Sequence, residues 1–551
     1  MNTETIKLGI TGMTCDHCAK SIEKLLSKSK GVKEANVSYP KATCECSYDP
    51  SKTSKAEIIN TINDTKKYRV KNEIPENENS ENNHFDLIII GGGSAAFSAA
   101  IKAESLGLST LMVNDGLDFG GTCVNVGCVP SKNLIRAGET AYHAKHSNFE
   151  GIKPKGVDID FAQIIKDKKV LVNTLQEKKY MDVVSDFENL TMLRGWAKFK
   201  NDKTILVDGR EYKALKFLIA TGATTNIPTI KGLKEVGYLT NVSLFDLEEK
   251  PKSLTILGAG YIGLEMAQAF SRLGVKVRIL EFTDRVLRSQ TEDVSNEIQK
   301  QFEAEGIKVF PNYRIDKVIR DENKIIISGT VSTTGQPFQF FEPGHMVVAT
   351  GIVPNTNRLG LDNLNLELTK SGQIAVNEKM ETSLSHIYAA GDVTNTPTFV
   401  YTAAFEGKIA IENAFSGTEN KADYSSLPWV VFTDPQIAGA GLDEEKAEAK
   451  GIPFEVSRLE LKDVPRSIVA NDTRGFIKLI RNTETDKLIG ARVVAPEGGE
   501  LIQQLSMSIK YGVTVKDLAD SFYPYLTLGE GVKLAAITFG KDVSKLSCCA
   551  S

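Results

Sequence analysis

The chain of 551 residues lacks several features that would place it in a specialised class of protein. No apolar run approaches the ~18 residues that a membrane-spanning helix needs, so we expect no membrane insertion. The first residues, MNTETIKLGI, lack the basic start and long apolar core of a secretory signal, which favours a cytoplasmic protein. The formal net charge of -4 includes no basic block, so nothing in the charge pattern indicates a nucleic-acid partner.

Cysteine is also scarce, because eight residues in 551 are too few for a disulfide-stapled secreted protein. The six histidines show no metal-ligand spacing, so we expect no zinc or iron site. The eight cysteines nevertheless fall in four close pairs, namely Cys15/Cys18, Cys44/Cys46, Cys123/Cys128 and Cys548/Cys549. In a reducing compartment, paired thiols indicate metal binding or redox chemistry.

The N-terminal residues 1–72 are predicted to form a small separate domain. Alternating and helical apolar patterns follow one another in the order βαββαβ, which is typical of a ferredoxin-like sandwich. Residues 73–84 are polar, rich in Asn and Glu, and predict a flexible linker.

Two later segments match the pattern G-x-G-x-x-G/A between a buried strand and a helix. The residues of the two motifs are Gly91, Gly93 and Ala96 in the first, and Gly258, Gly260 and Gly263 in the second. At such a place, bare backbone and a helix N-terminus can meet a pyrophosphate. Two copies predict two Rossmann-like α/β domains and two dinucleotides, a flavin paired with a nicotinamide.

The acid that binds the adenosine ribose is expected about 20 residues after each motif. In the second motif this residue is Glu281, which follows an apolar strand. In the first motif the same offset reaches Asn114, so either Asn114 or the adjacent Asp115 would take that place. Glu281 disfavours a 2′-phosphate by repulsion, whereas Arg285 and Arg288 would attract one. NADH and NADPH therefore both stay open.

Between the two motifs lies GGTCVNVGCVPSKNLIRAG, with Cys123 and Cys128 just ahead of a helical stretch that favours a thiolate. This segment resembles the flavoprotein disulfide reductase family, which includes glutathione reductase and dihydrolipoamide dehydrogenase. Further matches are ATG, GAGYIGLE, ATGIVPNT, IYAAGDVT and VVFTDPQIAGAGL, so the resemblance covers nearly everything from residue 85 onward. It implies an FAD-binding domain (85–225 and 345–424), an NAD(P)-binding domain (226–344) and an α+β dimerisation domain (425–551).

The resemblance also implies a role for each matching residue. Cys128 would lie against the flavin as the charge-transfer thiol, and Cys123 would be the exchanging thiol. Lys132 and Glu265 would form an ion pair beside the flavin. The other implied cofactor contacts are Asp392 at the ribityl chain, Tyr261 as the gate of the nicotinamide pocket, and Gly121, Thr122, Thr221 and Gly222 around the FAD.

The chain departs from the disulfide reductases near its C-terminus. Where that family carries H-P-T-x-x-E, this chain has YPYLTLGE, which keeps Thr527 and Glu530 but puts Tyr525 in place of the histidine. A phenol with a reference pKa near ~10 cannot shuttle protons at neutral pH as an imidazole near ~6.5 does. An ordinary disulfide substrate is therefore not expected.

The terminal Cys548 and Cys549, together with Tyr525, resemble the branch of that family that reduces Hg(II) to Hg(0) with NAD(P)H and FAD. Soft thiolates suit a soft cation, and Hg(II) can pass between sulfurs much as disulfides exchange. The resemblance implies a homodimer in which the tail delivers Hg(II) to the other subunit, where Tyr525 and Tyr180 flank the ion. Two other interpretations of the tail are a C-a-a-X prenylation signal, for which the upstream lysines are too few, and accidental surface cysteines.

The segment GMTCDHC, residues 12–18, resembles the heavy-metal-associated domain of copper chaperones and metal-transporting ATPases. Cys15 and Cys18 would capture one soft ion, with Met13 as an apolar plug; a thioredoxin-type redox motif is the rival interpretation. Cys44 and Cys46 share one face of a strand and are either a second metal site or buried core.

Two alternative functions are considered: a dihydrolipoamide dehydrogenase-like disulfide reductase, and a metal-sequestering chaperone fused to an inactive flavoprotein. The first would need a histidine where Tyr525 stands. The second does not explain two intact nucleotide motifs beside a Cys123/Cys128 pair.

Overall fold

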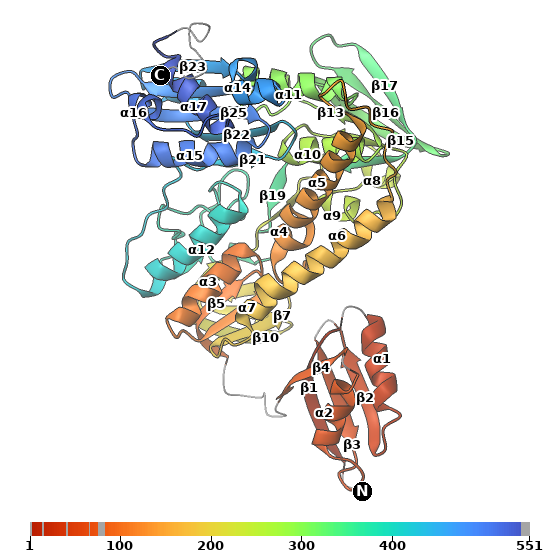
Figure 1. Cartoon of the computed structure of the whole chain (residues 1–551). Coiled ribbons are helices and arrows are strands. Elements are labelled where there is room, and N and C mark those ends of the chain that lie inside the picture. The colour runs from red at the N-terminus through yellow and green to blue at the C-terminus, as the bar shows by residue number, and fades with distance from the viewer. Residues whose placement is uncertain (1–2, 14–15, 40–41, 66, 75–82, 542–551) are drawn as a thin grey trace.

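The computed structural model describes residues 3–13, 16–39, 42–65, 67–74 and 83–541 (Figure 1). The predicted metal ligands Cys15, Cys548 and Cys549 lie outside these residues. Within the described ranges, no helix combines the length and apolar character needed to cross a bilayer.

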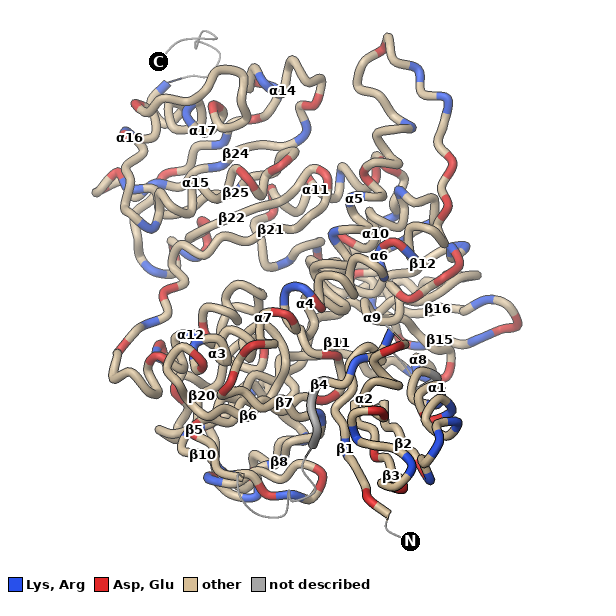
Figure 2. The backbone as a smooth tube through the Cα atoms, turned by 60° about the horizontal axis from the view of Figure 1, so that its bottom comes forward, with Lys and Arg blue, Asp and Glu red and all other residues tan. Residues whose placement is uncertain are grey.

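The N-terminal unit has the predicted βαββαβ order. Its elements are β1 (Glu4–Thr11), α1 (Asp16–Leu26), β2 (Val32–Ser38), β3 (Thr43–Tyr48), α2 (Lys55–Asn63) and β4 (Arg69–Ile74). The sheet order is β2-β3-β1-β4, and β1 runs antiparallel to both of its neighbours. Alternate side chains of β1, namely Ile6, Leu8 and Ile10, enter one apolar core, as the period of a strand requires. Lys20 and Lys24 of α1 are exposed, and Figure 2 shows basic residues in blue along this helix.

The second unit is built on a seven-stranded sheet whose core is parallel. Strands β7, β6, β5, β10 and β20 run parallel, while β9 and β8 add an antiparallel extension to β10. Its elements are β5 (His84–Ile90), α3 (Ser94–Ser105), β6 (Thr110–Asn114), α4 (Gly121–Val126), α5 (Cys128–Lys145), α6 (Phe161–Gln176), the π-helix η1 (Glu177–Met181), α7 (Asp182–Val184), β7 (Leu190–Arg194), β8 (Ala197–Asn201), β9 (Thr204–Val207), β10 (Arg210–Ile219), β20 (Ile387–Ala389) and α12 (Val400–Phe415). The long helices α5 and α6 lie side by side (Figure 1).

The third unit repeats the strand-helix-strand arrangement on a four-stranded parallel sheet of order β14-β13-β12-β18. An antiparallel sheet of β15, β16 and β17 lies next to it in the chain, and the short strands β11 (Ala223–Thr225) and β19 (Ile352–Pro354) pair at the crossing from the second unit. Its elements are α8 (Leu233–Val236), α9 (Asn241–Leu244), β12 (Ser253–Leu257), α10 (Tyr261–Arg272), β13 (Lys276–Leu280), α11 (Glu292–Ala304), β14 (Lys308–Phe310), β15 (Tyr313–Asp321), β16 (Lys324–Val331), β17 (Pro337–Glu342) and β18 (His345–Val348).

The C-terminal unit is an antiparallel sheet of order β21-β22-β25-β24-β23 covered by helices. Its elements are β21 (Trp429–Val431), β22 (Gln436–Gly441), α13 (Glu444–Ala449), β23 (Phe454–Glu460), α14 (Pro465–Val469), β24 (Phe476–Asn482), β25 (Leu488–Ala495), α15 (Gly498–Lys510), α16 (Val515–Asp520) and α17 (Leu528–Ile537). The predicted architecture is confirmed: a ferredoxin-like domain is followed along the chain by two Rossmann-like domains and an α+β domain. The residue boundaries of the domains stay predictions.

Candidate active site

The central cysteine pair lies at the junction of two helices. Cys123 is in the short helix α4, and Cys128 is the first residue of the 18-residue helix α5. Gly127 makes this approach possible, because a Cβ there would come within 2.8 Å of the carbonyl oxygen of Thr122. The two cysteines are not joined by a disulfide, and both are partly exposed.

The two thiols have opposite acidities. The thiol of Cys123 donates a hydrogen bond to the sulfur of Cys128, and this bond, followed by the charge of Lys132, lowers the pKa of Cys128 to about 7 against the effect of burial. The same hydrogen bond and burial raise the pKa of Cys123. Cys128 also begins a helix, where the dipole favours a negative charge. Cys128 is therefore the more readily ionised of the two thiols.

An ion pair lies one helical turn along α5. Lys132 Nζ is 2.8 Å from Glu265 Oε2, across 133 residues of sequence, and the carboxylate of Glu265 is almost fully buried. The other carboxylate oxygen accepts a 3.0 Å hydrogen bond from the backbone N–H of Phe432, whose ring lies 4.5 Å from the Lys132 ammonium. The roles of Cys123, Cys128, Lys132 and Glu265 came from resemblance, and the structure places all four together. Phe432 was missed; the matched segment VVFTDP was its only signal.

Two tyrosines were expected at the site. Tyr180 lies on η1, with its hydroxyl 3.5 Å from the hydroxyl of Ser94 and its ring edge-on to Phe97. Burial raises the pKa of Tyr180, and so do the two active-site cysteines, which places its phenol within their electrostatic reach. Tyr525 lies just before α17 with 54% of its surface exposed, and α17 is apart from α4 in both views (Figures 1 and 2). The structure therefore brings Tyr180, but not α17, to the thiols of the same chain.

The first glycine motif forms a cradle of bare backbone at the start of α3. Gly91 has φ 128°, and a Cβ on it would lie 2.1 Å from the carbonyl oxygen of Ala220. Gly93 caps α3, and a Cβ on Gly121 would lie 2.5 Å from its Cα, so the loop of Gly121 and Thr122 closes over the motif. Such a cradle fits a pyrophosphate. The other FAD contacts expected from the sequence are Ala96, which is fully buried in α3, and Thr221 and Gly222, which follow β10.

Three polar residues were proposed around the same cradle. The Asn114 side chain donates to the carbonyl of Leu117 at 2.9 Å, and Asp115 accepts from the N–H of Gly116 at 2.7 Å, so both brace their own loop. Asp392 differs from them. Burial raises its pKa, and among the described residues its carboxylate makes no hydrogen bond. It therefore keeps hydrogen-bonding capacity for a polyol chain such as the ribityl group of FAD.

The second glycine motif is folded in the same way. Gly258 has φ 99°, Gly260 caps α10, and a Cβ on Gly263 would lie 2.1 Å from the carbonyl oxygen of Gly258. The buried carboxylate of Glu281 accepts from the N–H of Ala259 at 2.6 Å, which fixes it at the mouth of the motif. These residues fit a second dinucleotide.

The two arginines near Glu281 both pair with Asp284. Arg285 reaches its carboxylate at 3.2 Å and Arg288 at 2.9 Å. Their charges are therefore partly neutralised, and the structure favours neither NADH nor NADPH.

In the N-terminal unit, Cys18 lies on the first turn of α1 and is buried beside the apolar core, against which Met13 packs. Cys15 falls outside the described residues, so the metal-capture hypothesis stays a prediction. Cys44 and Cys46 are fully buried in the same core.

One cluster that the sequence did not suggest has the composition of a metal site. Glu139, His143 and Asp434 bring their ligand atoms within 4.8 Å of one another. Asp434, however, is already paired with Arg272 and Arg474, each at 2.9 Å. Two guanidinium groups oppose a cation there, and we interpret the cluster as an ion-pair network between units.

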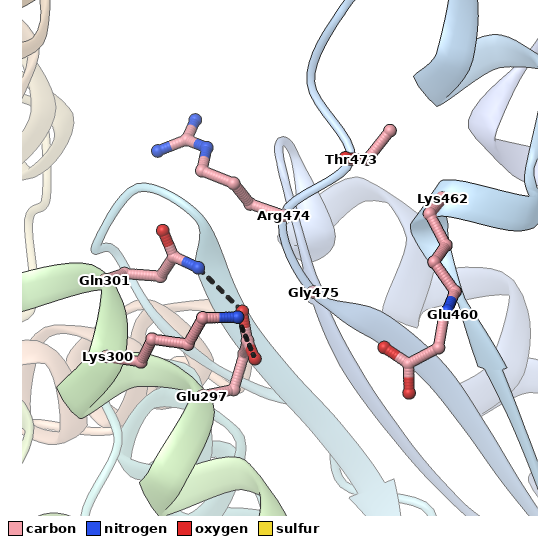
Figure 3. A pocket seen from close by; sticks show the side chains of 8 residues that line it. All are labelled: Glu297, Lys300, Gln301, Glu460, Lys462, Thr473, Arg474 and Gly475. Atoms are coloured by element: carbon pink, nitrogen blue, oxygen red, sulfur yellow. Dashed lines mark hydrogen bonds and ion pairs between the residues drawn. The ribbon is translucent and has the colours of Figure 1, made fainter. Parts of the chain in front are cut away.

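A separate cavity of about 350 Å³ lies between α11 and the β23–β24 sheet (Figure 3). Glu297, Lys300 and Gln301 line it from α11, opposite Glu460, Lys462 and Arg474. Its lining mixes both signs of charge, and it includes none of the cysteines, so it is not part of the redox site.

Two close cysteines at a helix start, lying in the sequence between two dinucleotide cradles, are the arrangement expected of a flavin-dependent dithiol oxidoreductase. Residues 85–407 match the pyridine nucleotide-disulphide oxidoreductase family, residues 427–536 its dimerisation domain, and residues 8–68 the heavy-metal-associated domain. The mercuric reductase of Lysinibacillus sphaericus is 40% identical over 99% of this chain and 99% of its own length. That of Staphylococcus aureus is 40% identical over the whole of both chains.

Among solved structures, the HOCl-induced flavoprotein disulfide reductase RclA of Escherichia coli, as its Cu(II) complex, matches with a TM-score of 0.72 and 27% identity. The match covers 81% of this chain and 98% of that one. The chain belongs to the pyridine nucleotide-disulphide oxidoreductases and, within them, to the mercuric reductase family. The family implies FAD and NAD(P)H as cofactors, and which of the two glycine cradles takes which of them stays a prediction.

Proposed function

We propose that the protein reduces Hg(II) to elemental mercury with NAD(P)H and so detoxifies mercury. The observation that carries the proposal is the Cys123/Cys128 pair at the start of α5, in a chain that is similar over its full length to mercuric reductases. The overall reaction is NAD(P)H + Hg(II) → NAD(P)⁺ + H⁺ + Hg(0). When bound, the nicotinamide supplies a hydride to the flavin, and the flavin supplies two electrons to the metal.

The protein's own residues would bind the ion and manage charge. Cys123, the exchanging thiol, displaces one thiolate ligand of the incoming Hg(II) and gives its proton to it, and the Cys128 thiolate displaces the second ligand. The hydrogen bond from Cys123 and, after it, the positive charge of Lys132 favour the ionised form of Cys128. Glu265 fixes the position of that ammonium at 2.8 Å. The uncharged metal atom has no affinity for thiolates and leaves.

The handover between cysteine pairs is the finer part of the proposal. Cys15 and Cys18 would capture the ion, the tail with Cys548 and Cys549 would carry it, and the central pair would receive it. The exposed Lys20 and Lys24 on α1 would favour anionic Hg(II)-thiol complexes near the capture loop.

The dimerisation domain supports a homodimer with shared sites. Tyr525 of the partner subunit would then complete the site beside Tyr180, which fits its exposure in the single chain. We expect this assembly in the cytoplasm, where the thiols stay reduced.

One assay tests the proposal against both rivals. Purified protein with excess thiol, Hg(II) and NADPH or NADH is followed at the nicotinamide absorbance, with mercury vapour trapped downstream. Metal-dependent oxidation with volatile mercury supports the proposal. Oxidation only with lipoamide or glutathione disulfide supports a disulfide reductase, and none at all supports a metal-sequestering protein.

The handover has its own test. Cys548→Ala with Cys549→Ala should slow turnover of bulky Hg(II)-thiol complexes far more than that of small ones, because the tail's role is ligand exchange. Equal losses with both substrates would contradict delivery by the tail.

A further inference from the structure

The residue expected to gate the nicotinamide pocket is contacted from the C-terminal unit. Tyr261 begins α10, and its ring centroid lies 5.7 Å from that of Trp429. Its hydroxyl lies 3.5 Å from Nε2 of Gln290, and burial raises its pKa to about 12, so the phenol stays protonated. Trp429 opens β21, whereas Tyr261 and Gln290 belong to the nucleotide-binding unit.

A fully buried arginine lies behind these contacts. Arg492, on β25, is 0% exposed, and its charge is balanced by Asp443 at 2.9 Å. Its Nη1 also donates to the backbone carbonyls of Ala440, Leu442 and Ala491. Burying an ion pair seldom adds stability over an apolar side chain of similar size, so this arginine calls for another role.

The arginine determines which way the Gln290 amide points. Arg492 Nε donates to Gln290 Oε1 at 3.1 Å, and a guanidinium has no acceptor. The carbonyl end of the amide must therefore face Arg492, and its NH₂ end faces the hydroxyl of Tyr261. The two hydrogen bonds form a directional relay from β25 to the first residue of α10.

The packing around this relay is equally specific. A Cβ on Gly439 would lie 2.4 Å from the ring of Trp429 and 2.9 Å from the side chain of Arg492. Glycine at this position of β22 therefore leaves room for both side chains. The Arg492 guanidinium is 5.6 Å from the Trp429 ring, so Trp429 contacts both Arg492 and Tyr261.

We propose that Arg492, Gln290 and Trp429 form a brace that holds the Tyr261 side chain in its resting position over the nicotinamide site. They are positioning residues: they set how easily the tyrosine moves aside when the nucleotide enters. The inference rests on the proposed function, because it takes Tyr261 as the gate. It links nucleotide entry to the C-terminal unit, which supplies two of the three residues.

The chain offers a direct probe, since it has only two tryptophans. Trp196 is exposed and stacks with Arg358, so Trp196→Phe leaves Trp429 as the reporter beside the gate. In this background of the FAD-loaded full chain, NADP⁺ and NAD⁺ are titrated against Trp429 fluorescence. Gln290→Leu removes one of the two side-chain hydrogen bonds to the Tyr261 hydroxyl and leaves that of Ser289. The gate should therefore open at less cost, and the nucleotide should bind about three- to fivefold more tightly.

The sign of this change separates a brace from simple damage, because a damaged fold binds nucleotide more weakly. Gln301→Leu is the matched control: it also removes a buried amide, which among the described residues bonds only Glu297 on the same helix, and it should leave the affinity unchanged (Figure 3). Arg492→Lys keeps a donor toward Gln290 and should preserve the parent affinity, whereas Arg492→Met should match Gln290→Leu.

Unchanged or weaker nucleotide binding in Gln290→Leu, with the control intact, overturns the brace, even if Arg492→Met fails to fold. If calorimetry shows that the nucleotide binds but the fluorescence of Trp429 does not change, Trp429 is not part of the brace. Failure of the proposed function gives a different result, in which neither NADP⁺ nor NAD⁺ binds the Trp196→Phe protein. Tyr261 then has no nucleotide site to gate.

Discussion

Two cysteine pairs in this chain have the same chemical groups and opposite chemistry. Cys44 and Cys46 lie on β3, opposite Leu8 and Ile6 of β1, and are fully buried. Burial raises the pKa of Cys44 to about 12, helped by the neighbouring Cys46, and raises that of Cys46 to about 11.

The central pair is also largely enclosed, yet one member is acidic. Cys128 receives a hydrogen bond from Cys123 and the field of Lys132, and its pKa falls to about 7. Burial alone disfavours a thiolate, whereas a donor and a cation reverse that effect. Of the two interpretations of Cys44 and Cys46, the geometry favours buried core over a second metal site.

The largest difference in activity is expected when one cysteine of each pair is replaced by alanine. Cys128→Ala should reduce mercury-dependent NAD(P)H oxidation by about three orders of magnitude or more, because it removes the thiolate that binds the ion. Cys46→Ala is the control and should leave the rate within about twofold of the parent. Comparable losses of activity in both variants would contradict the assignment of one cysteine pair to catalysis and the other to the core.

Next in size is the difference in reactivity with pH. Cys128 gains its thiolate as the pH rises through about 7, so its alkylation by iodoacetamide should increase from pH 6 to 8 and then level off. Cys44 and Cys46 stay protonated until far higher pH, and at pH 8 they should react at least ~100-fold more slowly. Peptide mass spectrometry of the native protein measures each site separately. Early alkylation of Cys44 would show that its environment is open.

A polar residue in place of Cys44 should test whether the Cys44/Cys46 pair on β3 stabilises the N-terminal unit. Cys44→Ser buries a hydroxyl in an apolar core and should destabilise the N-terminal unit by about 1–3 kcal/mol. Hydrogen exchange of residues 4–74 in the full chain measures the loss. Cys44→Val, apolar and similar in size, should cost less than about 1.5 kcal/mol. If serine were tolerated as well as valine, the buried-core interpretation would be wrong.

The smallest effect concerns the charges that tune Cys128. Lys132→Met removes the cation that lowers its pKa, so the midpoint of the alkylation profile should rise, with up to about tenfold less thiolate at pH 7. Glu265→Gln removes the opposing negative charge and should move the midpoint the other way. Shifts in the same direction for both variants would mean that repacking, and not charge, controls the thiol.

Much of the architecture could be predicted from local pattern. Alternation in β1 and the glycines at the starts of α3 and α10 are short-range signals, and the structure confirms the folds they predict. Residues that act over long separations carried no such signal. Phe432 lies 167 residues from the Glu265 carboxylate it donates to, and Arg492 lies 202 residues from Gln290. The residues next to Phe432 match a family segment but do not reveal its contact with Glu265, and nothing next to Arg492 reveals its contact with Gln290.

The sequence by itself determined the units, the two dinucleotide motifs and the pairing of the cysteines, because each depends on residues close together in the chain. Only the tertiary structure decided which thiol is acidic, which pair is core, and what braces Tyr261. Those properties depend on burial, on the direction of a hydrogen bond and on charges brought in from distant segments, none of which a spacing of residues encodes.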